Sequence, residues 1–229
     1  MFVDPLYFVF ALPAFLLALY AQFKVQSAYG RYSRQPNMRG ISGVQAAQIL
    51  LQYAGLTNVH IEGTPGQLSD HYDPRGKVLR LSADVGNGRS VAALGIVAHE
   101  VGHAQQDFQG YMPLRFRSML VPVTNLGTWL GPVLFFIGLL LNSVRMAEIG
   151  LIAFSAAVVF TAVTLPVELN ASKRALALLR ATNLVDSREL NGARSVLNAA
   201  ALTYFAALAQ AISTLLYYAF LLSGMRRND

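Results

Sequence analysis

Two histidines and a glutamate in the middle of the chain have the types and spacing of a metal-dependent hydrolytic centre. His99, Glu100 and His103 form the pattern H-E-x-x-H within residues 97–106. Residues four apart share a helix face, so His99 and His103 can place two imidazoles on one zinc ion. Glu100 lies about 100° round the helix, beside the open coordination position. There it can take a proton from a zinc-bound water and later give one to a leaving amine.

The surroundings of the motif favour a functional site. The chain has four histidines, and two of them are in this motif. Residues 90–96 and Ala104 are small or apolar, which predicts one continuous buried helix through the motif. The alternative is a pair of hydrogen-bonded histidines in a partly buried helix, with no metal.

The composition is typical of a membrane protein. Of the 229 residues, 54% are hydrophobic and only 13% are charged, against about a quarter charged in soluble domains. The chain has no cysteine, which excludes disulfides and a thiolate zinc site. The net charge of +6 is interpreted as charge of cytoplasmic loops. Nucleic acid is not expected as a partner, because no recognition motif accompanies the charge.

Four apolar segments are long enough to cross a bilayer: residues 6–23, 119–141, 149–167 and 199–223. A cleaved signal peptide is the alternative for the first segment, but it lacks a basic n-region and a small-residue cleavage site. The fourth could instead lie partly in the interface or re-enter. Fifteen of the eighteen Lys and Arg fall within residues 24–117 or 173–194, which predicts that these parts are cytoplasmic. The predicted division is a membrane helix 1–23, a cytosolic region 24–118 with the H-E-x-x-H helix, a membrane hairpin 119–167, a cytosolic helical region 168–198 and a membrane helix 199–229.

The cytosolic regions contain local signals of helices and strands. Ser42 and Gln45 form a possible capping box for a helix over 42–54 that Gly55 stops, and Asp186 and Glu189 form a second box. Residues 59–62 and 78–81 alternate as strands do, and residues 70–77 contain a turn. We expect a peptide substrate to bind extended along the strand 78–81, because an exposed edge offers unpaired backbone groups.

A zinc site with two histidines needs a third protein ligand. Glu168, at the rim of the third apolar segment, fits this role best, because it arrives on a second helix; the alternative is a solvated carboxylate paired with Lys173 or Arg174. Asp107 follows His103 on the same helix, where a ligand trio would strain tetrahedral geometry. The remaining acids considered are in the strand-and-turn region: Glu62, Asp70 and Asp73. His71 could be a third ligand or an oxyanion donor, or it could merely cap a turn.

Several stretches of the chain together resemble a known family. They are residues 4–5, 21–25, 70–75, 98–104, 166–172 and 200–204. In these the chain is similar to the YugP-type neutral zinc metallopeptidases of bacterial membranes, which are related in plan to HtpX-type peptidases. The resemblance implies zinc on His99, His103 and Glu168, with Glu100 as the catalytic acid and base. HtpX-type peptidases carry E-x-x-x-D on the helix of the third ligand, whereas this chain has Ser172 in place of the aspartate, so what orients the ligating imidazoles is left open. Further candidates for oxyanion or substrate contacts are His71, Tyr204 and Asn170.

The sequence thus predicts a mainly α multi-pass membrane protein with a small cytosolic zincin-like α+β element. The expected function is that of a gluzincin-like zinc metalloendopeptidase of the bacterial inner membrane. Its active site would face the cytoplasm, and its partners would be the lipid bilayer and a peptide or membrane-protein substrate. A catalytically inactive zinc-binding scaffold is the first alternative. A transporter that uses Glu168 as an ion site is the second, and the absence of ionisable residues inside the apolar segments disfavours it.

Overall fold

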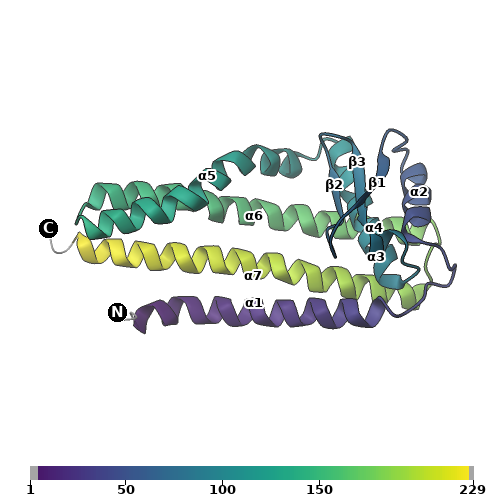
Figure 1. Ribbon diagram of the computed structural model, residues 1–229, viewed down its shortest axis with the longest axis horizontal. Helices are drawn as coiled ribbons and strands as arrows, with labels where there is room; N and C mark the ends of the chain where they lie inside the picture. Colours follow the sequence, from purple (N-terminus) through teal and green to yellow (C-terminus); the bar gives the residue numbers. More distant parts are fainter. Residues whose placement is uncertain (1–4, 227–229) are drawn as a thin grey trace. The chain divides into compact units, whose positions relative to one another are not determined.

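The structure is a computed structural model that describes residues 5–226 (Figure 1). Helices dominate the described part, and a small sheet lies between α2 and α3 in the chain order. The elements are α1 (Pro5–Tyr32), α2 (Gly43–Tyr53), β1 (His60–Thr64), β2 (His71–Asp73), β3 (Val78–Ser82), α3 (Ala83–Gly86), α4 (Val91–Phe108), α5 (Met112–Leu140), α6 (Val144–Ala181) and α7 (Ser187–Met225).

The chain divides into two compact units. Of the described residues, those within 1–21, 115–166 and 203–229 form the first unit, and Gln22–Leu114 and Val167–Leu202 form the second. Helices α1, α6 and α7 each continue from one unit into the other without a break. The predicted boundaries at residues 23, 167 and 198 therefore fall inside helices and not at their ends.

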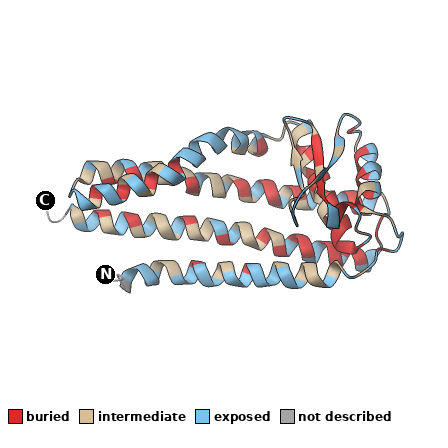
Figure 2. Ribbon diagram, viewed as in Figure 1, coloured by how far each residue is buried: buried red, intermediate tan, exposed pale blue. Residues whose placement is uncertain are grey.

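The first unit consists of helices whose apolar side chains are largely exposed. The four apolar segments predicted from the sequence lie in α1, α5, α6 and α7, each long and apolar enough to cross a membrane. Leu140 is 85% exposed and Ile152 is 70% exposed, and exposed residues are spread along these helices (Figure 2). Apolar surface of this extent requires a non-aqueous surrounding, so the chain has the character of a multi-pass membrane protein.

The second unit has an aliphatic core and a three-stranded sheet. The strand order is β1-β3-β2, with β1 parallel and β2 antiparallel to β3. Strand β3 is buried along most of its length and packs with α2 and α4 in one apolar cluster. The sequence predicted that residues 70–77 contain a turn. The structure has the turn at residues 74–77, and the first part of the range forms the strand β2.

The prediction that a peptide binds along residues 78–81 is wrong. Strand β3 is the central strand, so both of its edges are already paired, Leu79 with Ile61 on one side and with Tyr72 on the other. The sequence does not predict β2 as a strand, so from the sequence one edge of β3 is expected to be unpaired.

Capping boxes begin two of the helices, as predicted. The Ser42 side chain accepts from the backbone of Gln45, and the Gln45 side chain accepts from the backbone of Ser42. Gly55, with a φ of +70°, follows the end of α2, in the left-handed region that favours glycine. Asp186 and Glu189 exchange the same pair of bonds at the start of α7.

Candidate metal centre

Helix α4 carries the H-E-x-x-H motif and begins at a capped residue. The Ser90 hydroxyl accepts from the backbone N–H of Ala93 at 3.2 Å, which satisfies one of the free N–H groups of the first turn. The helix runs from Val91 to Phe108, and most of its residues up to Ala104 are buried. This confirms the predicted continuous buried helix and fixes the backbone on which the histidines stand.

Helix α6 approaches α4 closely at a glycine inside the motif. A Cβ atom added to Gly102 would lie 2.6 Å from the backbone oxygen of Ala171, closer than real Cβ contacts. Only glycine therefore lets the two backbones meet at this point. The approach brings Glu168, one turn before Ala171 on α6, and Ser172, directly after it, close to His99 and His103.

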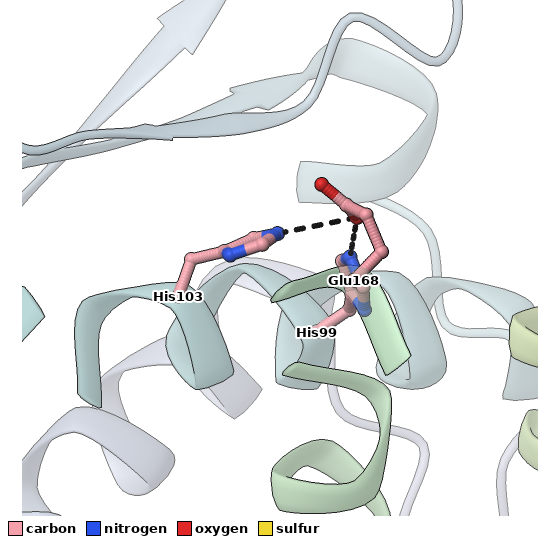
Figure 3. A group of neighbouring side chains, drawn as sticks. All are labelled: His99, His103 and Glu168. Atoms are coloured by element: carbon pink, nitrogen blue, oxygen red, sulfur yellow. Dashed lines mark hydrogen bonds and ion pairs between the residues drawn. The ribbon is translucent and has the colours of Figure 1, made fainter. Parts of the chain in front are cut away.

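The structure brings the three predicted metal ligands together, as Figure 3 shows. The Oε2 atom of Glu168 lies 3.2 Å from Nε2 of His99 and 3.5 Å from Nε2 of His103. The two imidazole rings are nearly perpendicular, with centroids 4.7 Å apart. Each residue thus directs one ligand atom toward a common point, from two different helices.

The two His–Glu distances and the types of ligand atom are both consistent with a tetrahedral zinc site. Zinc–ligand lengths of about 2.0–2.1 Å correspond to ligand–ligand separations of about 3.3 Å in a tetrahedron, close to the two observed values. Two imidazole nitrogens and one carboxylate oxygen are ligands that zinc accepts. Three protein ligands leave the fourth position for water or substrate, as in catalytic zinc sites.

The competing carboxylates are engaged elsewhere. Asp107 accepts from the Tyr72 hydroxyl at 2.7 Å and pairs with Lys77. Asp70 accepts from both the backbone and the side chain of Ser82. The other two acids, Glu62 and Asp73, both bond Arg80.

Glu100 is buried next to this ligand group and is not part of it. Its Oε2 atom accepts from the backbone N–H of Tyr72 at 3.0 Å, so β2 holds the carboxylate in place. Burial raises the pKa of Glu100 above its usual range, although the nearby imidazoles oppose the shift. A carboxylate beside the ligand group and outside it is placed to accept a proton and return it.

The imidazoles are held from behind by side chains of both helices. Ser172 Oγ lies 3.1 Å from Nδ1 of His99, at the position where the resemblance expected an aspartate. Gln106 Oε1 lies 3.0 Å from Nδ1 of His103. The sequence did not single out Gln106, although a glutamine three residues after a ligand, in a buried helix, was an available signal.

The remaining candidates have different surroundings. His71 is an exposed residue of β2, and its Nδ1 lies 2.8 Å from the backbone oxygen of Ser69. Asn170 Oδ1 accepts from Gln106 and from Arg174. Tyr204 belongs to the part of α7 in the first unit, whereas the ligand group lies in the second. Their predicted contacts with a substrate or an oxyanion stay predictions.

Comparison with known proteins adds an independent finding. Residues 7–223 match the model of a family described as "Putative neutral zinc metallopeptidase". The chain is also similar to a Bacillus subtilis (strain 168) protein named "Putative membrane protease YugP". The two are 41% identical over 224 residues, which cover 97% of this chain and 100% of the relative. No solved structure matches the chain.

Proposed function

Because the chain belongs to this family of neutral zinc metallopeptidases, we propose that it hydrolyses peptide bonds with zinc held by His99, His103 and Glu168. The observation that carries the proposal is the convergence of two Nε2 atoms on one carboxylate oxygen, at 3.2 and 3.5 Å. A glutamate as third ligand on a separate helix is the gluzincin-like arrangement.

Glu100 is proposed as the general base and acid. When bound, zinc supplies a Lewis acid that lowers the pKa of water to about 7 and polarises the scissile carbonyl. Glu100 takes a proton from the attacking water and returns it to the leaving amine. The Tyr72 N–H keeps the carboxylate oriented for both transfers.

The rival is a scaffold that binds zinc and does no chemistry. Replacing Glu100 distinguishes a peptidase from a scaffold, because Glu100 lies outside the ligand group and is not needed to hold the metal. Glu100→Gln should keep one zinc per chain and lose nearly all cleavage, since general acid–base catalysis contributes about 10² to 10⁴-fold. His99→Ala and Glu168→Gln should both lower zinc affinity, and His99→Ala should also abolish cleavage.

The experiment uses purified full-length protein in detergent, metal analysis after chelator competition, and cleavage of labelled casein and of a membrane-protein fraction. Equal cleavage by wild type and Glu100→Gln would refute the mechanism. Zinc binding by the wild type without cleavage of either probe would favour the scaffold. Full zinc occupancy of Glu168→Gln under chelator competition would show that the third ligand is wrong.

We also propose that the metal centre is on the cytoplasmic side of the bacterial inner membrane and acts on membrane or membrane-proximal proteins. The argument is the positive charge of residues 24–117 and 173–194. Single cysteines at Ser143 and Asn58 test it, because the chain has no cysteine of its own. An impermeant thiol reagent applied to intact cells should label Ser143→Cys and not Asn58→Cys. The opposite pattern would invert the arrangement.

A further inference from the structure

Gln106 is a buried polar residue one turn beyond His103 on α4. Its side chain is 0% exposed, and a buried amide of this kind must satisfy its donors and its acceptor inside the protein. Gln106 does so with partners on two helices, which are His103 on α4 and Val167 and Asn170 on α6.

The partners on α6 fix which end of the Gln106 amide faces which way. Its Nε2 lies 2.8 Å from the backbone oxygen of Val167, which can only accept. Nε2 also donates to Asn170 Oδ1 at 3.0 Å. Asn170 Oδ1 accepts in turn from Arg174 Nε at 2.7 Å, and a guanidinium can only donate. The amide nitrogen therefore faces α6, and the amide oxygen faces His103.

This orientation requires a hydrogen on Nδ1 of His103. The Gln106 oxygen, 3.0 Å from Nδ1, can only accept, so Nδ1 carries the hydrogen. In the neutral imidazole the lone pair is then on Nε2, the atom that faces Glu168. A metal ligand needs this lone pair, and its orientation is commonly fixed through the other ring nitrogen.

We infer that Gln106 is the positioning residue of the metal centre: it locks His103 in the Nδ1–H tautomer and ties the two ligand-bearing helices together through Val167 and Asn170. This inference rests on the proposed zinc site and names what orients one of its ligands. The same role on His99 falls to Ser172, but a hydroxyl both donates and accepts, so it does not impose a tautomer. Gln106 therefore has the larger effect of the two.

The test compares variants that remove the acceptor, the donors or neither. Gln106→Met keeps the length of the side chain and removes all three hydrogen bonds. Gln106→Glu keeps an acceptor for the Nδ1–H of His103 and loses the amide donors to α6. Gln105→Met changes the neighbouring, partly exposed glutamine and is the matched control. Each full-length protein is purified in detergent, stripped of metal and titrated with zinc against a chelator, and its thermal midpoint is recorded.

Gln106→Met should weaken zinc binding about 10- to 100-fold, the usual effect of losing a partner of a ligating histidine. Gln106→Glu should recover most of that affinity, because zinc binding depends on the acceptor for the Nδ1–H of His103. Its thermal midpoint should stay low, because stability depends on the amide donors to α6. Gln105→Met should match the wild type, and Ser172→Ala should weaken binding less than Gln106→Met. The inference is overturned if Gln106→Met binds zinc like the wild type, or if affinity simply follows the thermal midpoint through the series.

A second measurement reads the tautomer directly and needs no metal. With only four histidines in the chain, ¹⁵N-histidine labelling gives a simple NMR spectrum. The metal-free wild type should show an exchange-protected Nδ1–H for His103 that disappears in Gln106→Met; its presence in both proteins would overturn the inference. Absence of zinc binding by the wild type would instead refute the proposed function, and the NMR comparison would still decide the role of Gln106.

Discussion

The two units of this chain solve the problem of packing helices in different ways. In the second unit, α2, α4 and the sheet bury a continuous aliphatic cluster that includes Leu50, Leu79 and Leu94, all 0% exposed. In the first unit, many of the largest side chains are exposed, and the described core is a small group around Phe135 and Tyr218, whose rings stack at 4.4 Å. The second unit is stabilised as water-soluble proteins are, by removing apolar surface from water.

Helix packing in the first unit depends on small residues. Gly127 on α5 meets the backbone of Ala153 on α6, and Gly131 and Gly150 lie at further close approaches of the same two helices. Such contacts stabilise helix pairs in lipid, where apolar side chains gain little by leaving the solvent. Helices therefore approach closely at glycines in both units. At Gly102 the close approach also positions the metal ligands.

The largest expected effect comes from replacing Gly102, and Gly127 provides the comparison in the first unit. Gly102→Ala places a Cβ 2.6 Å from the Ala171 oxygen and must push α6 away from the histidines. Because ligand geometry tolerates only a few tenths of an ångström, zinc affinity should fall by about 100-fold or more. Gly127→Ala, which places a Cβ 2.3 Å from the Ala153 oxygen, should lower the thermal midpoint and leave one zinc per folded chain. Zinc titration of both proteins checks this, and equal loss in the two would show that the metal site does not depend on local packing.

Two aliphatic truncations should separate the units by stability. Leu94→Ala removes a fully buried side chain of the second unit and should cost about 2–5 kcal/mol. Ile152→Ala removes a side chain of the first unit that is 70% exposed, and it should change stability by less than about 0.5 kcal/mol in detergent. Denaturant unfolding of the purified proteins measures both. A large loss at Ile152 would mean that this face is covered by protein.

Sequence reasoning succeeded where the signal is local. The two capping boxes, the helix through His99 and His103, and the four long apolar helices all follow from residues a few positions apart. Helix caps and hydrophobic periodicity are fixed by neighbours in the chain, so they survive without knowledge of the fold.

What the sequence could not supply depends on distant partners. Strand β2 has only three residues and exists because it pairs with β3, and this pairing also closed the edge expected to bind peptide. Gln106 meets Val167 across 61 positions, and Ser172 meets His99 across 73. The local pattern does not identify these distant partners. The glutamine three residues after a ligand and the serine in place of an aspartate were signals in the sequence, but their contacts with the imidazoles and with the facing helix became visible only in the structure.

Hydroxyl groups offer a third, smaller contrast between the units. The Ser90 hydroxyl satisfies an otherwise free N–H at the start of α4, so Ser90→Ala should cost about 1 kcal/mol. The Thr161 hydroxyl bonds carbonyls of its own helix at 3.0 Å, and these already accept helical N–H groups, so Thr161→Ala should be nearly neutral. Thermal midpoints of the two variants check the difference, and Ser90→Asp should restore the cap. A Thr161→Ala loss as large as that of Ser90→Ala would contradict it.

The smallest expected effect is a pH dependence confined to the second unit. The Arg80 guanidinium, followed by the backbone N–H groups of Arg75 and Gly76, lowers the pKa of Asp73 below its usual range. A carboxyl whose pKa is lower in the folded than in the unfolded state stabilises the fold above its unfolded pKa of about 3.9. That stability is lost as the pH falls through this value toward the folded pKa.

Asp73→Asn should therefore flatten the decline of the thermal midpoint below about pH 4, by the equivalent of about 1 kcal/mol or less because the pair is partly solvated. Arg80→Gln should flatten part of the same decline, since it removes the leading cause. Thermal midpoints of the three proteins between pH 6 and about pH 3 measure the effect, and an unchanged decline in Asp73→Asn would show that other carboxylates set the acid limit of the fold.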